Sequence, residues 1–239
     1  MHKAIFGAVL ILGACSSANS EAGQAGGSRS TGQRDFQVGE FHKVGLEGAH
    51  DVIVTVGGAP SVRAEGDSEA LERLDIRVEN GELQVGSRRN GWFSRNHGHV
   101  TVHVSVPSLD GASLSGSGNL RIDRAEAETF AAQLAGSGDI QIGALRARRA
   151  DFDIAGSGGI TAGGQADEAE IDIAGSGDAR LDALQTRRAK VSVAGSGDVS
   201  LRATETVEGD LLGSGNLTVH GSARCSVDKL GSGDVRCGG

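Results

Sequence analysis

A Gly-Ser-Gly triplet recurs seven times in the second half of the chain, and its spacing constrains the fold more than any other feature. The triplets begin at Gly116, Gly136, Gly156, Gly175, Gly195, Gly213 and Gly231. Successive starts lie 20, 20, 19, 20, 18 and 18 residues apart. A constant period of this length is typical of solenoids, in which each repeat is one structural unit that stacks on the next.

Apolar and polar residues alternate on both sides of each triplet, which predicts a strand before it and another after it. Two residues before the first glycine, the column reads Leu114, Leu134, Ile154, Ile173, Val193, Leu211 and Lys229. Because Lys229 breaks this column, we expect a slip that brings Leu230 inward in the last repeat. Glycine, and the Asn or Asp that follows six of the triplets, tolerate positive φ, so a tight turn is expected between the strands.

Two strands alone are not stable in water, but stacked repeats bury a continuous apolar column. The sequence therefore predicts an all-β protein: a β-solenoid, or β-helix, of about seven coils over residues 109–239, with an N-terminal β-rich cap over residues 35–108. Return segments of five to seven residues, the first being 123–129, are expected to be loops. A series of ordinary hairpins in a β-sandwich is the alternative.

The cap region contains five segments that read as strands, namely residues 52–56, 61–65, 75–79, 83–85 and 100–106. Asn80-Gly81 predicts a hairpin turn between two of them. Residues 67–74 predict a short helical turn with Asp or Ser as its N-cap.

These segments carry a resemblance to a known family. The motifs are Phe41-His42-Lys43-Val44, Asp51-Val52-Ile53-Val54, and residues 100–107 leading into the first triplet at residues 114–119. Over residues 36–237 the chain resembles the autotransporter-adhesin head domain, also called the GIN domain. The resemblance implies a fold similar to pectin-lyase β-helices, no catalytic residues, and a role in adhesion.

The N-terminus predicts export and lipid attachment. His2 and Lys3 precede an apolar run that is too short to span a bilayer but has the length of a secretory signal. The run ends in Leu12-Gly13-Ala14-Cys15, which resembles a bacterial lipobox. We expect a signal peptide at residues 1–14, a lipid anchor on Cys15 and a flexible tether at 15–34, with the outer membrane of a Gram-negative cell as the location. An ordinary signal peptide with a chance cysteine is the alternative.

The other two cysteines, Cys225 and Cys237, fall six residues before and six after the first glycine of the last triplet. A disulfide across the final coil is the natural pairing in an exported protein. It would restrain a coil whose edge is otherwise open. Two free buried thiols are the alternative.

Charged residues that point outward suggest few chemical sites. Acidic residues dominate the strand before the turn: Asp151, Asp153, Glu170, Asp172, Glu208, Asp210 and Asp228. A solvated face explains them, with cation binding or a glycosidase-like carboxylate pair as minority interpretations. His97, His99 and His103 are close enough in sequence to bind a metal, but no acidic residue or cysteine lies near them. We expect no catalytic residue, metal or cofactor.

One segment combines aromatic and arginine residues, which are enriched at interfaces. It contains Arg88, Arg89, Trp92, Phe93 and Arg95. We expect these residues to contact an anionic glycan, a lipid headgroup, or a protein that is either another envelope protein or a second copy of the chain. The alternative is that Trp92 and Phe93 pack beneath the cap.

Net charge and composition complete the functional prediction. The formal net charge is −8, which disfavours binding to nucleic acid. The sequence thus predicts a non-enzymatic, lipid-anchored envelope protein that adheres to or interacts with a partner. A polysaccharide-acting β-helix enzyme and a structural envelope or stress protein are the alternatives.

Overall fold

The computed structural model describes residues 30–88 and 98–238, which form an almost entirely β structure. The first part contains β1 (Thr31–Phe36), β2 (Lys43–Gly48), β3 (Asp51–Val56), β4 (Ser61–Asp67), α1 (Ser68–Arg73), β5 (Leu74–Glu79), β6 (Glu82–Ser87) and β7 (Val100–Val106). The second contains β8 (Gly111–Gly116), β9 (Asn119–Gly136), β10 (Asp139–Gly156), β11 (Gly159–Gly175), β12 (Asp178–Gly195), β13 (Val199–Gly213), β14 (Leu217–His220), β15 (Arg224–Gly231) and β16 (Val235–Cys237).

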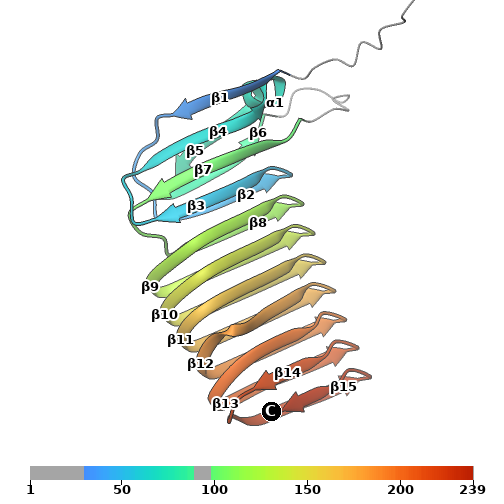
Figure 1. The fold of residues 1–239 in the computed structure, drawn as a ribbon. Coiled ribbons are helices and arrows are strands. Elements are labelled where there is room, and N and C mark those ends of the chain that lie inside the picture. Colours follow the sequence, from blue (N-terminus) through green and yellow to red (C-terminus); the bar gives the residue numbers. More distant parts are fainter. Residues whose placement is uncertain (1–29, 89–97, 239) are drawn as a thin grey trace, which may run out of the picture.

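The predicted β-solenoid is confirmed, with its coils stacked in parallel as one column (Figure 1). Each triplet aligns with the triplet of the coil above, so that Gly136 pairs with Gly156 and Gly156 with Gly175. The solenoid makes about six turns rather than seven.

The return segments were expected to be loops, and this is wrong for all but the last, where residues 221–223 lie between β14 and β15 outside any strand. β9 runs without interruption from Asn119 to Gly136, so the segment 123–129 is part of a long bent strand that pairs with β10. Length differences between coils are absorbed in this region as register shifts, for example between Ile142 and Leu145. Backbone pairing therefore continues around most of each coil instead of stopping at its corners.

The turn glycines have two different roles. The first glycine of every triplet has a positive φ, from 128° at Gly175 to 141° at Gly195. The third glycine does not, but a Cβ there would overlap backbone of the coil above, as at Gly158 against the Gly138 carbonyl oxygen. Both positions therefore exclude a side chain: the first glycine through its backbone conformation and through close stacking, the third through close stacking alone.

The Asn and Asp residues after the triplets were noted because they tolerate positive φ, but at these turns the structure places only glycines of the triplets in that conformation. Asn80, in the β5–β6 hairpin, is the one non-glycine residue with positive φ in the described part of the chain. The side chains instead cap the next coil. Asp198 Oδ1 accepts a bond from the Asn216 amide at 2.9 Å, and Asn216 Oδ1 accepts one from the Asp234 amide at 3.0 Å. They stabilise stacking rather than the turn itself.

The core is a set of aliphatic columns along the solenoid axis. The predicted columns are buried as far as the last coil, where Cys225 and Val235 are half-buried and Lys229 and Cys237 are exposed. A further column, four residues before the triplets, was not anticipated: Ala112, Ala132, Phe152, Ile171 and Val191 are all buried. The predicted slip in the last repeat is wrong. Leu211 pairs with Lys229, which keeps the inner position, and Leu230 points outward with 74% of its surface exposed.

The cap region both extends the stack and closes it. β2 and β3 form an additional coil whose corner, Gly48, lies over Gly116. Above it, β4 pairs with β7 and β1 with β4, both antiparallel, which ends the parallel stack. Residues 31–34 were expected to belong to the tether, but they form the first four residues of β1 and pair with β4. The predicted helix is α1, which Asp67 caps by accepting from the Glu69 and Ala70 amides.

Candidate partner-binding trough

The segment that was expected to bind a partner lies mainly outside the described residues. The structure does not describe four of its residues: Arg89, Trp92, Phe93 and Arg95. The predicted lipid-anchor residue Cys15 is likewise outside the described residues. Arg88 is described: its amide donates to the Arg73 carbonyl oxygen at 2.8 Å, and its side chain is 61% exposed, 3.8 Å from Asp75. A candidate site must therefore be sought on the solenoid.

A trough of about 710 Å³ lies on the sheet face that precedes the turns. We call this the pre-turn face. The trough runs along the solenoid axis from β6 and β2, across β8 to β11, and reaches β12. Its polar and charged lining consists of Lys43, Glu47, Glu82, Gln84, Ser113, Ser115, Gln133, Asp153, Asp172 and Ser192.

The trough is hollow because small residues occupy outward positions in its floor. Gly45, Gly111 and Ala131 supply almost no side chain at its upper end. A Cβ on Gly45 would lie 2.6 Å from Glu82 Oε1, 2.8 Å from Gln84 Oε1 and 2.9 Å from Ser113 Oγ. Three oxygen atoms thus converge above one glycine, and any side chain there would displace them.

The hydrogen bonding at this upper end leaves mostly acceptor atoms for a ligand. Ser113 Oγ donates to Glu82 Oε1 at 2.7 Å, so the serine hydrogen is already used. Glu82 retains its other lone pairs, since a carboxylate accepts several hydrogen bonds. The cluster therefore favours a ligand that donates hydrogen bonds or carries positive charge.

Carboxylates continue along the trough without neutralisation. Asp153 and Asp172 are register neighbours on β10 and β11, and within the described residues neither forms an ion pair. Burial raises the pKa of the Asp172 carboxyl, and the nearby charges of Glu170 and Asp153 raise it further, against a smaller opposing effect of Lys190. Like charges in register on adjacent strands destabilise a sheet.

Neighbouring carboxylates on the same face are treated differently. Arg149 Nε contacts Asp151 at 2.8 Å, and Lys190 Nζ contacts Glu170 at 3.2 Å. The column that contains Asp153 and Asp172 continues outside the trough to Asp210 and Asp228, again without ion pairs in the structure's described ranges. Within the described residues the column of Asp153 and Asp172 forms no ion pair, whereas Arg149 and Lys190 contact Asp151 and Glu170 in the adjacent column.

The return segments carry a separate ladder of opposite charges. In register, Arg149, Glu168 and Arg188 alternate in sign on three successive coils. Arg188 contacts Glu168 at 2.5 Å and Glu205 at 3.5 Å. The hydrogen bond from Arg188, and its charge, lower the pKa of Glu168. This ladder stabilises stacking and presents little net charge to a partner.

The histidines that were considered for metal binding are paired with carboxylates. His99 Nε2 lies 2.8 Å from Asp51 Oδ2, and His103 Nε2 lies 3.2 Å from Glu65 Oε1, while His97 is outside the described residues. Burial raises the pKa of Asp51, but hydrogen bonds from Asn119 and His99 outweigh it and lower the pKa overall. Over residues 30–88 and 98–238, no three His, Cys, Asp or Glu side chains are grouped so that they could hold a metal ion.

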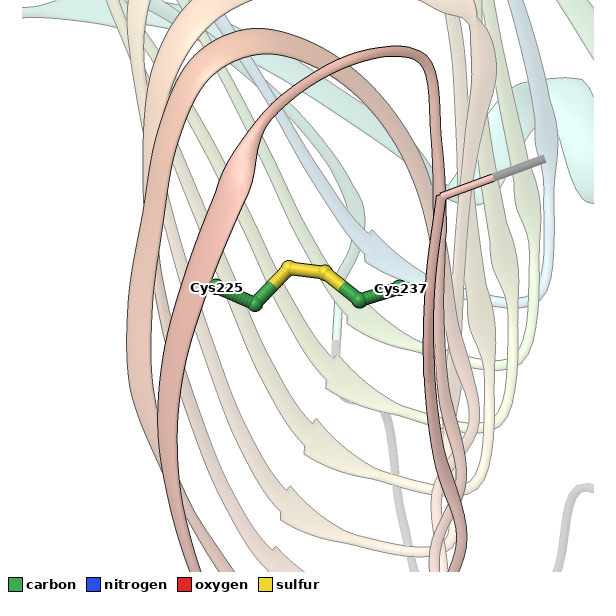
Figure 2. The surroundings of a disulfide bond; sticks show 2 residues. All are labelled: Cys225 and Cys237. Carbon is green, nitrogen blue, oxygen red and sulfur yellow. A yellow bond between two sulfur atoms is a disulfide. The ribbon is translucent and has the colours of Figure 1, made fainter.

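The two late cysteines meet in the last coil. The structure joins Cys225 in β15 to Cys237 in β16 by a disulfide, with 6.4 Å between their Cα atoms (Figure 2). The bond crosses the interior of the coil and restrains the end of the solenoid. Neither cysteine lines the trough.

Sequence reasoning found the acidic part of the trough but not its upper end. Lys43, Glu47, Glu82 and Gln84 come from β2 and β6, which had been assigned to the cap without a place in the stack. A signal was present: Leu46, Val52 and Val54 have the same spacing around Gly48 as the core columns have around a triplet. The missing Ser-Gly concealed it.

In the described part of the chain, no helix is long and apolar enough to cross a membrane. A comparison with curated protein sequences finds no relative.

Solved structures of similar shape include a putative adhesin from Bacteroides fragilis, with a TM-score of 0.79 and 22% identity over 88% of this chain and 98% of that one. A putative lipid binding protein from Parabacteroides distasonis has a TM-score of 0.70 at 20% identity, covering 88% and 97%. A putative adhesin from Parabacteroides merdae has 0.68 at 15%, with the same coverage. At these identities the likeness establishes the fold. Residues 40–223 match the family model "Putative auto-transporter adhesin, head GIN domain", and the chain belongs to this family.

Proposed function

We propose that this protein is a lipid-anchored, non-enzymatic module of the cell envelope that adheres to a partner through the trough on its pre-turn face. The observation that carries the proposal is the column with Asp153 and Asp172, which forms no ion pair in the described residues although Asp151 and Glu170 in the adjacent column do. Membership of an adhesin-like family supports an interaction role. The partner should present positively charged groups, because the lining has four carboxylates and one lysine.

The experiment measures binding of a ten-residue lysine peptide to the full chain by calorimetry, with a ten-residue glutamate peptide as the reference. We expect binding of the lysine peptide alone, weakening as salt rises. The variant Asp153→Asn/Asp172→Asn should weaken it at least about tenfold, because both removed charges line the trough.

A matched control removes two carboxylates elsewhere. Glu72 on α1 and Glu126 on β9 are both exposed and outside the trough. Glu72→Gln/Glu126→Gln changes net charge by the same amount and should leave binding within about twofold. Equal losses in the two double variants would show that net charge alone attracts the peptide, and would refute the trough as the site.

Anchoring is tested separately. Cys15→Ser removes the thiol that the lipobox resemblance assigns to the lipid. In a Gram-negative host, the parent chain should sediment with outer membranes and the variant should be released into the soluble periplasmic fraction. Retention of the variant in membranes would contradict lipid anchoring at Cys15 without affecting the trough proposal.

A polysaccharide-acting enzyme is the second candidate, because one observation favours it. The pKa of Asp172 is raised by burial and by nearby carboxylates, and a carboxyl with a raised pKa close to a second carboxyl is what glycoside hydrolysis uses as its general acid. Product release from acidic and neutral polysaccharides is the test. Turnover that is lost in Asp172→Asn would replace the adhesion proposal with the enzymatic one.

A further inference from the structure

The two ends of the solenoid are built differently. At one end, antiparallel β1 and β4 and the helix α1 cover the stack, whereas at the other β15 and β16 form the last layer (Figure 1). In the described part of the chain, β15 pairs with β13 and β16 with β14, and neither has a strand on its other side. Their outer backbone groups form an edge of the kind to which further strands add.

The interior of the last coil differs from the coils above at one column. Leu114, Leu134, Ile154, Ile173, Val193 and Leu211 form a buried column, and the next position in register is Lys229. Its ammonium donates to the Gly233 carbonyl oxygen at 2.8 Å, across the turn of its own coil. A further layer stacked on this end would bury that charge next to an aliphatic column.

The disulfide occupies the rest of the same layer. Figure 2 shows Cys225 and Cys237 spanning the coil from one strand to the other. β16 is only three residues long and has three register partners on β14, so the disulfide also holds this short strand in place. Lys229 and Cys225 are both in β15, and Cys237 is in β16. All three residues therefore belong to the last layer of the solenoid.

We propose that the C-terminal coil is a self-association surface that Lys229 holds closed. A second copy of the chain is the occupant that the edge fits best. If two β15 strands pair antiparallel about Ser226, Arg224 of each copy lies opposite Asp228 of the other. This places two opposite-charge pairs on the outward face, where such pairs stabilise a sheet. The obstacle is the inner face, because association would desolvate the Lys229 ammonium, which forms no ion pair in the described residues, and burying an unneutralised charge is unfavourable.

The test replaces the charge by a residue typical of the column. We expect the parent chain to sediment as a monomer and Lys229→Leu to dimerise, with a dissociation constant at least about tenfold lower. Lys229→Arg keeps the charge and should stay monomeric. Lys190→Leu adds a leucine to an exposed position of β12 and controls for added apolar surface. If Lys229→Leu loses its β-type circular dichroism, Lys229→Gln is measured in its place.

A charge exchange tests the pairing itself. In the Lys229→Leu chain, Arg224→Asp should weaken the dimer, and Arg224→Asp/Asp228→Arg should restore it. A folded Lys229→Leu or Lys229→Gln chain that remains monomeric at the same concentrations would overturn the proposal. A dimer that is equally stable in all three charge variants would also overturn it, since association would then occur elsewhere. Neither result bears on binding in the trough.

Discussion

The Gly136 carbonyl oxygen lies in the space that a Cβ atom on Gly156 would occupy, and Gly156 has a φ of 134°. Gly156→Ala therefore combines a disfavoured backbone conformation with a clash against the coil above. Such strain costs about 1–3 kcal/mol, and the clash adds to it, so we expect the free energy of unfolding to fall by about 3 kcal/mol or more. Urea unfolding monitored by circular dichroism measures the loss.

Two substitutions serve as controls for this prediction, one at a glycine far from the triplets and one inside the same triplet. Gly39 has no atom within 4 Å of its added Cβ, and Ser157 between the two glycines is exposed. Gly39→Ala and Ser157→Ala should each change stability by less than about 0.5 kcal/mol. A large loss of stability in Ser157→Ala would show that the serine of the triplet also stabilises stacking, which we do not expect.

Removing a trough carboxylate should stabilise the fold while it weakens binding. Because its pKa is raised in the folded state, Asp172 binds a proton more readily there than in the unfolded chain. Its ionised form therefore costs stability at neutral pH, and the cost disappears as the pH falls below its ordinary pKa of 3.8. Asp172→Asn should gain roughly 0.2–1 kcal/mol at pH 7, the usual size of a cross-strand charge effect.

The pH dependence distinguishes this from a packing effect. Thermal unfolding of parent and variant at pH 7 and at about pH 3 should show a difference that is lost at the lower value. A gain of equal size at both pH values would mean that the asparagine packs better and that charge is not the cause. No gain at pH 7 would mean that Asp172 is neutralised in solution.

The repeat predicted the solenoid because its period, its alternation and its glycines agree on one architecture. What it could not predict is how the return segments fold. Residues 123–129 have no regular alternation, and they become strand because the next coil, β10, offers a backbone with which they pair. The capping role of the Asn and Asp residues was missed for the same reason: their partners are amides 18 or 20 residues away, such as the Asn216 amide bound by Asp198.

The last coil shows the limit of reading each repeat by its own hydrophobicity. Leu230 was assigned to the interior because it is apolar, but strand pairing with β13 fixes Lys229 inside and Leu230 outside. A register shift by one residue would have turned every side chain of β15 to the opposite face. The trough was only half predictable, because Gly45 and Glu82 reach it through parallel pairing of β2 with β6 and β8.

The ladder of Arg149, Glu168 and Arg188 should make stacking sensitive to salt. The charge of Asp151 raises the pKa of the neighbouring Arg149 guanidinium. The hydrogen bond and charge of Arg188 lower the pKa of Glu168. Glu168→Gln removes the central charge and leaves like charges from Arg149 and Arg188 on either side. We expect a lower thermal midpoint at low salt, with the difference narrowing in 1 M NaCl because exposed charges are screened.

Glu126→Gln is the matched control for the ladder, since Glu126 lies on the same return side without an ion pair in the described chain. Its midpoint should equal that of the parent at both salt concentrations. A deficit in Glu168→Gln that persists unchanged in 1 M NaCl would point to a lost hydrogen bond from Arg188 rather than to the charge pattern.

Opening the disulfide should release the last coil before the rest of the solenoid. The Cys225–Cys237 bond closes a short loop, and in the chain-entropy account its loss lowers stability by roughly 3 kcal/mol. β16 has only three partners on β14, so in Cys225→Ser/Cys237→Ser the amides of β15 and β16 should exchange with deuterium faster, while those of β10 and β11 keep the parent's protection. Mass spectrometry of exchanged peptides measures both. Equal acceleration in all coils would show that the bond stabilises the whole domain and that the last coil is no separate unit.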